Sequence, residues 1–421
     1  MTLEQDSGKV MSLQDSDHGD FDEEVEVDGY TEELVQYRVG LCYPIRIGDM
    51  LEGTYRIEHK LNHGESSTVW LAHDTEKQKD VALKIIFPGD RGEYEYSMQK
   101  EIKRTVEDTS NLVIYLTSFS LPGCSGKGNH RVLVFDVRGP SLSYHLLKQT
   151  SMATRMSAAR QLLKALECLH NAGIVHHGEL APASCSLDSV HANYSTDLNE
   201  SNVMFGVAPL DNLSTKAKYE LLGRPKKLAL PSNLWRQGEL VRPLKVPKSL
   251  LTDTVYLGDF GLATKAGTEV RHKMLSPRNI VYYAPERFHN VNPSFASDMW
   301  SYMCLFTRLY IGYTPWYSYS YCSVITEMVR TLGPLPMHWK GYYNAYGTWD
   351  NSWYDQHKMC DPKVALESFI KEQRPEVSSV ERNHVLKIMC QVFRYSPDGR
   401  PTATQLLQDP SFKAIMEIYC N

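Results

Sequence analysis

The sequence predicts an α+β protein in which a small β-rich lobe precedes a large, mainly helical lobe. Residues 55–74 have the pattern of two strands around a turn, and residues 80–87 have that of a third strand. Residues 153–173 carry apolar side chains at helical spacing and predict a long helix that faces a core. Most of the chain after residue 285 is also predicted to be helical. A strand-rich lobe beside a helical lobe suggests a nucleotide cleft between them.

We divide the chain into three parts. Residues 50–138 form the predicted small lobe, with a helical stretch at 93–108 and a buried strand at 131–137. Residues 139–415 form the predicted large lobe. Residues 1–36 are acidic and polar, cannot bury enough apolar surface to fold alone, and are expected to be a disordered tail.

The composition is that of an ordinary globular protein, with 42% hydrophobic and 23% charged residues in 421. A formal net charge of -5 gives no reason to expect direct binding of nucleic acid. No apolar run reaches the roughly 18 residues of a membrane span, and the N-terminus lacks the apolar core of a signal peptide. Nine cysteines without a CxxC pair indicate reduced thiols in a cytosolic or nuclear protein.

A turn that could cover phosphates lies in the stretch LNHGESSTVW. Small residues let backbone N–H groups approach phosphate oxygens, and the pattern G-x-G-x-x-G-x-V serves this purpose in many nucleotide sites. Here the glycine positions of the pattern hold Asn62, Gly64 and Ser67, and Val69 follows. With a single glycine, a simple hairpin turn is an equal explanation.

Lys84 ends the strand segment VALK and could hold the α- and β-phosphates of a nucleotide. Such a lysine needs a carboxylate from the next helix. Glu101 is the first candidate and Glu95 the second, because the helix phase is open at this stage.

Four short motifs follow in a fixed order. They are Asp259-Phe260-Gly261, Ala284-Pro285-Glu286, Asp298-Met299-Trp300 and a late Arg400. Together with the VALK segment, they resemble the motifs of eukaryotic protein kinases, and the resemblance covers about residues 50–415.

This resemblance implies the bilobal protein-kinase fold and the binding of ATP and Mg²⁺. Asp259, at the end of an apolar strand, would be a metal ligand. Glu286 would pair with Arg400, and Asp298 would brace the catalytic loop.

Two registers compete for the catalytic loop, which should follow His176. In the first, residues 177–184 put Glu179 where the catalytic Asp belongs, which would misplace the carboxylate and make the chain a pseudokinase. In the second, Asp197 accepts the substrate proton and Asn202, five residues on, is a metal ligand. We favour the second, in which Asn199 replaces the lysine that would contact the γ-phosphate.

The second register implies an insert at residues 178–196. Without it, the chain would run from His177 directly to Asp197 and on to Asn202 at the usual spacing. Codons for the residues at both ends can contain splice donor and acceptor sequences, so we hypothesise an unspliced intron. The alternative is a real loop that leaves the active site without moving Asp197.

Several segments resemble the SR-protein kinase family, in particular divergent members from filamentous fungi. They are the entry segment 43–74, VLVFDVRGPSL, MVRTLGPLPMHW and an insert at 206–252 before Asp259. This resemblance implies that Phe135 is the gatekeeper, that the backbone at Asp136 and Arg138 binds adenine, and that Val69 and Ala82 form the roof of the adenine pocket.

Family members phosphorylate serine in Arg/Ser-rich splicing factors, so the resemblance implies a serine/threonine kinase with protein substrates. It also implies a monomer in the cytoplasm and nucleus, with no membrane partner. In the expected mechanism, Lys84 is held by Glu101, Asp259 and Asn202 hold Mg²⁺, and Asp197 is the base. The alternative is a catalytically impaired scaffold that still binds ATP.

Overall fold

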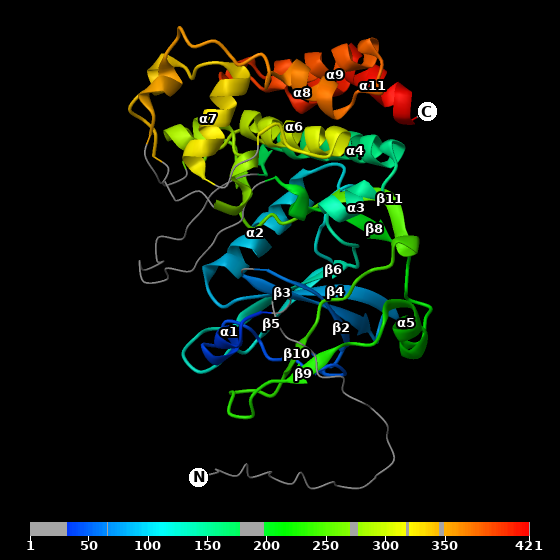
Figure 1. Ribbon diagram of the computed structural model, residues 1–421. Coiled ribbons are helices and arrows are strands. Elements are labelled where there is room, and N and C mark those ends of the chain that lie inside the picture. Colours follow the sequence, from blue (N-terminus) through cyan, green and yellow to red (C-terminus); the bar gives the residue numbers. More distant parts are fainter. Residues whose placement is uncertain are drawn as a thin grey trace, which may run out of the picture.

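The computed structural model describes residues 32–64, 66–176, 198–269, 277–316, 320–344 and 349–420. Figure 1 shows a strand-rich lobe at the N-terminal side of the chain and a helical lobe built from later residues. The α+β bilobal architecture expected from the sequence is confirmed.

The strand-rich lobe is one antiparallel sheet with the order β1-β2-β3-β4-β6-β5. Its strands are β1 (Met50–Leu51), β2 (Tyr55–His63), β3 (Ser67–Asp74), β4 (Lys79–Ile86), β5 (Thr117–Leu121) and β6 (His130–Asp136). Helix α2 (Asp90–Thr105) crosses from this sheet toward the helical lobe. The predicted strands over 55–74, 80–87 and 131–137 are confirmed, whereas β1 and β5 were not foreseen.

Alternation along the strands explains why the sheet has two apolar faces. In β4, Val81, Leu83 and Ile85 pack into one buried cluster, whereas Ala82 and Ile86 belong to another. Successive side chains of a strand point to opposite faces, so β4 is covered on both sides. The second cluster faces the cleft and is the one that can line a nucleotide pocket.

The helical lobe is built around α4 and α6. Its helices are α3 (Tyr144–Lys148), α4 (Met152–Asn171), α6 (Phe295–Ile311), α7 (Tyr321–Leu332), α8 (Leu366–Gln373), α9 (Ser379–Val392), α10 (Ala403–Gln408) and α11 (Pro410–Cys420). Helix α6 begins at a capping box in which Ser294 and Ser297 bond each other's backbone N–H groups, and such boxes fix a helix start.

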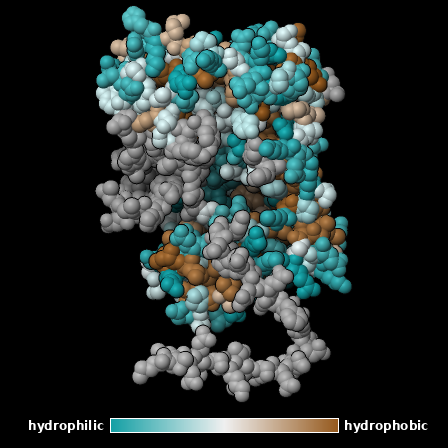
Figure 2. Space-filling view, viewed as in Figure 1, coloured by the Kyte–Doolittle hydropathy of each residue, from teal (hydrophilic) through white to brown (hydrophobic). Residues whose placement is uncertain are grey.

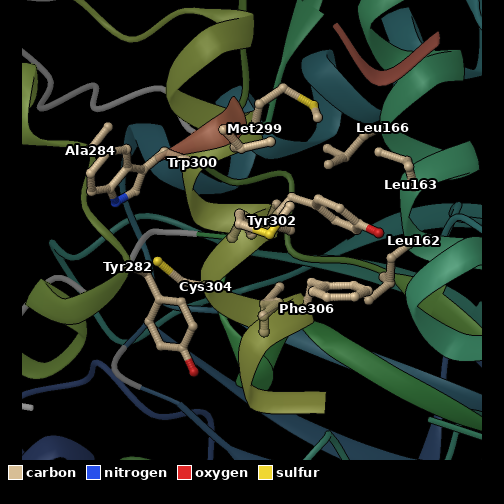
Figure 3. Close-up of a cluster of buried hydrophobic side chains, with 14 of the residues drawn as sticks. Leu162, Leu163, Leu166, Tyr282, Ala284, Met299, Trp300, Tyr302, Cys304 and Phe306 are labelled. Carbon is tan, nitrogen blue, oxygen red and sulfur yellow. The ribbon is translucent and has the colours of Figure 1, made fainter. Parts of the chain in front are cut away.

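Apolar residues of α6 pack against α4, as Figure 3 shows for Phe306 beside Leu162 and for Met299 on the side of Leu166. The Tyr302 hydroxyl donates to the carbonyl of Ala159 at 3.0 Å, so this buried polar atom is satisfied.

Three short two-stranded sheets belong to the cleft and to the insert. They pair β8 (Val203–Val207) with β11 (Leu251–Leu257), β7 (Ile174–Val175) with β12 (Thr264–Lys265), and β9 (Lys227–Ala229) with β10 (Glu239–Val241). The β8–β11 pair sets the cleft floor, because Asn202 lies directly before β8 and Asp259 lies two residues after β11.

The insert between β8 and β11 crosses to the strand-rich lobe. It contains α5 (Thr215–Leu222), β9 and β10, and Figure 1 shows all three beside the strand-rich lobe. Glu239 N donates to the carbonyl of Ile45 at 2.8 Å, and the Glu239 carboxylate accepts from Ile47 N at 2.9 Å. The insert predicted at 206–252 is therefore a structured part of the lobe that it reaches.

The prediction of disorder up to residue 36 is wrong for residues 32–36. Glu32 is buried, and α1 (Leu34–Arg38) packs beside the sheet through Tyr37. The Glu32 carboxylate accepts hydrogen bonds from the buried Lys60 ammonium and from the Tyr37 hydroxyl. The acidic composition concealed this, because one carboxylate finds a buried cation that lies far along the sequence. Hydrophobic residues are gathered on the surface over α1 (Figure 2), including Leu34, Val35 and Val39.

None of the described helices is long and apolar enough to cross a membrane. The eight cysteines in the described ranges form no disulfide with one another.

Candidate active site

Lys84 on β4 lies between two carboxylates that come from different parts of the chain. Its Nζ is 2.7 Å and 2.9 Å from the two carboxylate oxygens of Glu95 on α2. It is also 3.1 Å from Oδ1 of Asp259, which follows β11. The strand, the helix and the turn after β11 therefore meet at one ammonium group.

The prediction that Glu101 holds Lys84 is wrong, and the second candidate Glu95 is the partner. Glu101 instead bonds Arg104 at 2.8 Å and Lys265 at 2.8 Å. The two glutamates are six positions apart on a helix, so they point to different sides. The buried positions of α2 include Gly92, Glu95, Met98 and Ile102, a helical stripe that contains Glu95 and leaves out Glu101. This helical spacing of buried positions was the pattern in the sequence that could have identified Glu95 as the partner of Lys84.

The charges of this cluster shift one another. Burial raises the pKa of Glu95, and the ammonium of Lys84 offsets only part of that effect. Desolvation acts on Asp259 in the same direction, but the nearby Lys84 charge outweighs it and lowers the pKa of the Asp259 carboxyl. Burial would lower the pKa of Lys84, yet its two carboxylate partners raise it. Lys84 is therefore a permanent cation, and Asp259 is an anion at neutral pH.

The turn that carries Asp259 is stabilised by contacts of its neighbours Gly258 and Phe260 with His176. Asp259 has a φ of 59°, in the left-handed region that few side chains adopt, which is a common mark of a functional site. Phe260 is buried against the ring of His176 in an edge-on contact with 5.4 Å between centroids. The Nε2 atom of His176 lies 3.0 Å from the carbonyl of Gly258.

Asp298 on α6 braces the segment that leads into the catalytic loop, as expected. Its Oδ2 accepts from the backbone N of His176 at 2.8 Å and lies 3.0 Å from Nε2 of His170. Burial would raise the pKa of Asp298, but these contacts lower it. The carboxylate can thus stay ionised while it holds the backbone.

The pairing of Glu286 with Arg400 is also confirmed. Two parallel hydrogen bonds of 2.6 Å and 2.7 Å join the guanidinium to the carboxylate, and both side chains are buried. This bidentate pair fixes the segment around Glu286 to the segment just before α10.

Part of the catalytic loop lies in the described structure. Leu198 is buried in the main core, and the carbonyl of Asn202 accepts from Gly258 N at 2.8 Å. Asn202 therefore lies beside the Asp259 turn. Asn199 occupies the position at which the motif has a lysine. It is buried, and its side chain accepts a hydrogen bond from Ser201 N at 2.7 Å, which stabilises the loop. Asp197 and the proposed insert at 178–196 lie outside the described residues, and both registers stay predictions.

The predicted nucleotide residues lie on neighbouring strands. Val69 pairs with Lys84 across β3 and β4, and Ala82 pairs with Phe135 across β4 and β6. The turn between β2 and β3 is closed by Gly64 N donating to the Ser67 carbonyl at 2.8 Å, and Asn62 pairs with Val69.

At the far end of β6, the Asp136 carboxylate bonds Lys79 at 2.6 Å, and the Arg138 guanidinium stacks over Tyr256 at 3.8 Å.

One apolar cluster joins the predicted Val69, Ala82 and Phe135 to residues that were not predicted. The latter include Leu61 on β2, Met204 on β8 and Tyr256 on β11. Met204 and Tyr256 pair across β8 and β11, so the cluster reaches both lobes. The signal that could have found Met204 was its place two residues after the predicted metal ligand Asn202.

No group of three or more His, Cys, Asp or Glu that could hold a metal by itself occurs in the described ranges.

Comparison with known proteins agrees with this geometry. Residues 238–412 match the family described as protein kinase domain. A serine/threonine protein kinase of Aspergillus fumigatus is 24% identical over 400 residues, which are 90% of this chain and 89% of that protein. The serine/threonine-protein kinase SRPK of Physarum polycephalum is 25% identical over 409 residues, 91% of each chain. SRSF protein kinase 3 of the mouse is 30% identical over 169 residues, 37% of this chain and 29% of that protein.

The fold, the lysine between two carboxylates and the family match define a eukaryotic protein kinase. The relatives named above carry the names of serine/threonine protein kinases, and this chain is similar to the kinase named SRPK among them.

Proposed function

We propose that this kinase transfers the γ-phosphoryl group of ATP to serine in Arg/Ser-rich protein segments such as those of splicing factors. The observation that carries the proposal is the position of Lys84, held by Glu95 on one side and 3.1 Å from Asp259 on the other. In phosphoryl transfer the protein contributes mainly positioning and charge, and both require such an arrangement. The substrate class rests on the relatives named SRPK and SRSF protein kinase.

Each residue would then have one role. Lys84 binds the α- and β-phosphate oxygens of ATP, and Glu95 keeps the ammonium in place. The apolar side chains of Val69, Ala82 and Phe135 contact the adenine ring. Asp197 accepts the proton of the substrate hydroxyl as the oxygen attacks the γ-phosphorus.

Asp259 and Asn202 fit a divalent metal that is held partly by phosphate oxygens. Mg²⁺ in such sites takes only one or two protein carboxylates and completes its octahedron with phosphate oxygens and water. The Asp259 side chain is 45% exposed and ionised, and the backbone of Asn202 contacts the preceding Gly258. We propose Mg²⁺ as this metal, which supplies positive charge to the phosphates when bound.

The test is phosphoryl transfer from labelled ATP with Mg²⁺ to an Arg/Ser-repeat peptide, with an Arg/Ala-repeat peptide as the matched control. The chain is compared with a form that lacks residues 178–196, and Asp197→Ala is made in both. Transfer to the serine peptide that disappears with Asp197→Ala supports the proposal and the second register. Transfer by the shortened form alone supports the intron hypothesis.

Binding of ATP by both forms without transfer to this peptide or to generic substrates would favour the scaffold alternative. In that case Asn199, which stands where a lysine would contact the γ-phosphate, would be the first residue to examine.

We further propose that the kinase acts as a monomer in the cytoplasm and nucleus. Gel filtration with light scattering and imaging of a tagged chain test these two points. A dimer in dilute solution, or retention in another compartment, would contradict them.

A further inference from the structure

The segment between β8 and β11 starts and ends at the cleft floor but lies mainly on the other lobe (Figure 1). Its ends are closed by a hydrogen bond of 2.8 Å from Ala208 N to the carbonyl of Leu250. Asn202 precedes the start of this segment and Asp259 follows its end. The part of the strand-rich lobe that this segment contacts is therefore linked through the chain to Asn202 and Asp259.

The insert binds the strand-rich lobe through a buried cluster of charged side chains around Lys218 of α5. The Lys218 Nζ is 2.8 Å from the Glu58 carboxylate on β2 and 2.5 Å from the Asp80 carboxylate on β4. The three side chains are only 3%, 3% and 2% exposed. Asp80 is also 2.8 Å from the ring of His73. Charges without solvent around them interact strongly, and the loss of Lys218 would leave the Glu58 carboxylate with Arg56 and the Asp80 carboxylate with His73.

The Glu58 carboxylate stays ionised in this cluster. Burial would raise the pKa of Glu58, but the hydrogen bonds from Lys218 and Arg56 lower it. Glu58 therefore keeps its attraction to Lys218 at neutral pH.

Two further hydrogen bonds join the insert to the backbone of β2 and β4. Leu244 N donates to the carbonyl of Lys60 on β2 at 2.8 Å, and Asp80 N donates to the Asp211 carboxylate at 2.7 Å. Lys60 lies two residues before Asn62, where the turn over the phosphates begins. Strand β2 has two register shifts against β3 in this stretch, so its pairing with β3 alone defines its course less well.

We propose that Lys218 is a positioning residue of the ATP site, which holds in place β2 and, at its end, the described turn residues Asn62, Gly64 and Ser67. The inference rests on the proposed use of ATP. A turn with the single glycine Gly64 has less backbone freedom to bring its N–H groups close to the phosphates. Contacts from the insert to β2 hold the turn that follows this strand. Loss of the Lys218 charge is therefore expected to weaken ATP binding, although Lys218 itself does not contact ATP.

The decisive variant is Lys218→Met, which keeps the length of the side chain and removes the charge. Lys216→Met is the matched control, because Lys216 lies on the same helix, is 86% exposed and is 4.0 Å from Glu220. Lys218→Arg keeps the charge and is expected to restore most of the function. Leu244→Pro removes the N–H that donates to the Lys60 carbonyl and also constrains the backbone at residue 244, and it decides the question should Lys218→Met fail to fold.

Two measurements are made on the full chain. The first is hydrogen exchange of the amides of β2 and the turn at 62–67 without ATP, which we expect to speed up about tenfold in Lys218→Met while α4 and α6 stay unchanged. The second is calorimetric ATP affinity together with steady-state kinetics, in which Kd and KM for ATP rise about tenfold and kcat changes little.

The proposal is overturned if folded Lys218→Met and Leu244→Pro both keep the exchange of the turn and the ATP Kd within about twofold of the unaltered chain. It is also overturned if both variants speed up exchange throughout the molecule, since Lys218 would then be a general stability residue. The exchange measurement needs no nucleotide and no peptide. A failure of the proposed kinase function, seen as absent phosphoryl transfer, is thus separate from a failure of this inference.

Discussion

At the scale of single residues, the site depends on which carboxylate faces Lys84. Glu95 and Glu101 are residues of the same type on the same helix, and the side of the helix to which each points decides its role. Glu95 is buried and bonds Lys84 with both oxygens, whereas Glu101 lies at the surface with Arg104 and Lys265. Substitution of one or the other therefore has very different consequences.

Glu95→Gln is expected to reduce kcat/KM about 10- to 100-fold, because a charge-assisted hydrogen bond to Lys84 is lost. Glu101→Gln removes only exposed ion pairs and is expected to keep the activity within about twofold. Steady-state kinetics on the Arg/Ser-repeat peptide measures both. Equal losses in the two variants would mean that the pairing seen here is not the one used in catalysis.

His130 provides a prediction on pH. It starts β6, is buried, and has Nδ1 at 3.1 Å from the carbonyl of Ile86. Burial lowers the pKa of His130 to about 4. An unfolded histidine takes up a proton near pH 6.5, so from there down to about pH 4 only the unfolded chain is protonated at this position.

The contribution of His130 to the free energy of unfolding is therefore fully retained above pH 6.5 and falls by about 1.4 kcal/mol per pH unit as the pH decreases through this window. His130→Phe should reduce the pH slope of the free energy of unfolding by that amount, measured in urea from pH 7 to pH 4. The exposed His357→Phe is the control. An unchanged slope in His130→Phe would show that His130 does not carry this dependence.

At the scale of elements, the buried pair of Glu286 and Arg400 joins the short helix η4 (Pro285–His289) to the segment before α10. Arg400 also lies over the ring of Trp300 at 4.9 Å, so it connects α6 as well. Three elements that are distant in sequence depend on one guanidinium.

Arg400→Ala is expected to lower the free energy of unfolding by about 3–5 kcal/mol, because the Glu286 carboxylate would remain buried without its partner. The neighbouring exposed Arg394→Ala, which loses one bond to the Gly399 carbonyl, should change it by less than about 0.5 kcal/mol. Thermal or urea unfolding measures both. A small effect of Arg400→Ala would mean that water reaches Glu286 readily.

At the scale of the whole molecule, two distant segments complete the strand-rich lobe. The chain from Glu32 to Cys42 covers one side, and the insert with α5, β9 and β10 covers another. Tyr37 and Cys42 pack with Leu230 and Leu240, so the two segments also contact each other. The sheet of β1 to β6 is thus buried on surfaces that its own strands would leave open.

Deletion of residues 1–42 is expected to lower the free energy of unfolding by about 3–5 kcal/mol, since Lys60 would be buried without Glu32. Deletion of residues 1–31 removes no described contact and serves as the matched control, with an unfolding midpoint close to that of the full chain. Lys60→Met in the longer deletion should recover part of the loss. Equal midpoints for the two deletions would contradict a structural role of residues 32–42.

The sequence by itself determined the lobes, Lys84, Asp259, and the pairs made by Glu286 and Asp298. These depend on local periodicity and on short motifs in order, which are visible without coordinates. The register of the catalytic loop stays a prediction, because Asp197 lies outside the described residues.

Only the tertiary structure decided that Glu95 rather than Glu101 holds Lys84, that Glu32 is buried, and that Lys218 binds β2. The phase of α2 depends on what packs against it. The partners of Lys60 and Lys218 are 28 and 160 positions away in the chain, too far for any local pattern to show. Charged residues such as Lys60 and Glu58 look like surface residues in the sequence, and they become buried because segments from elsewhere in the chain cover them.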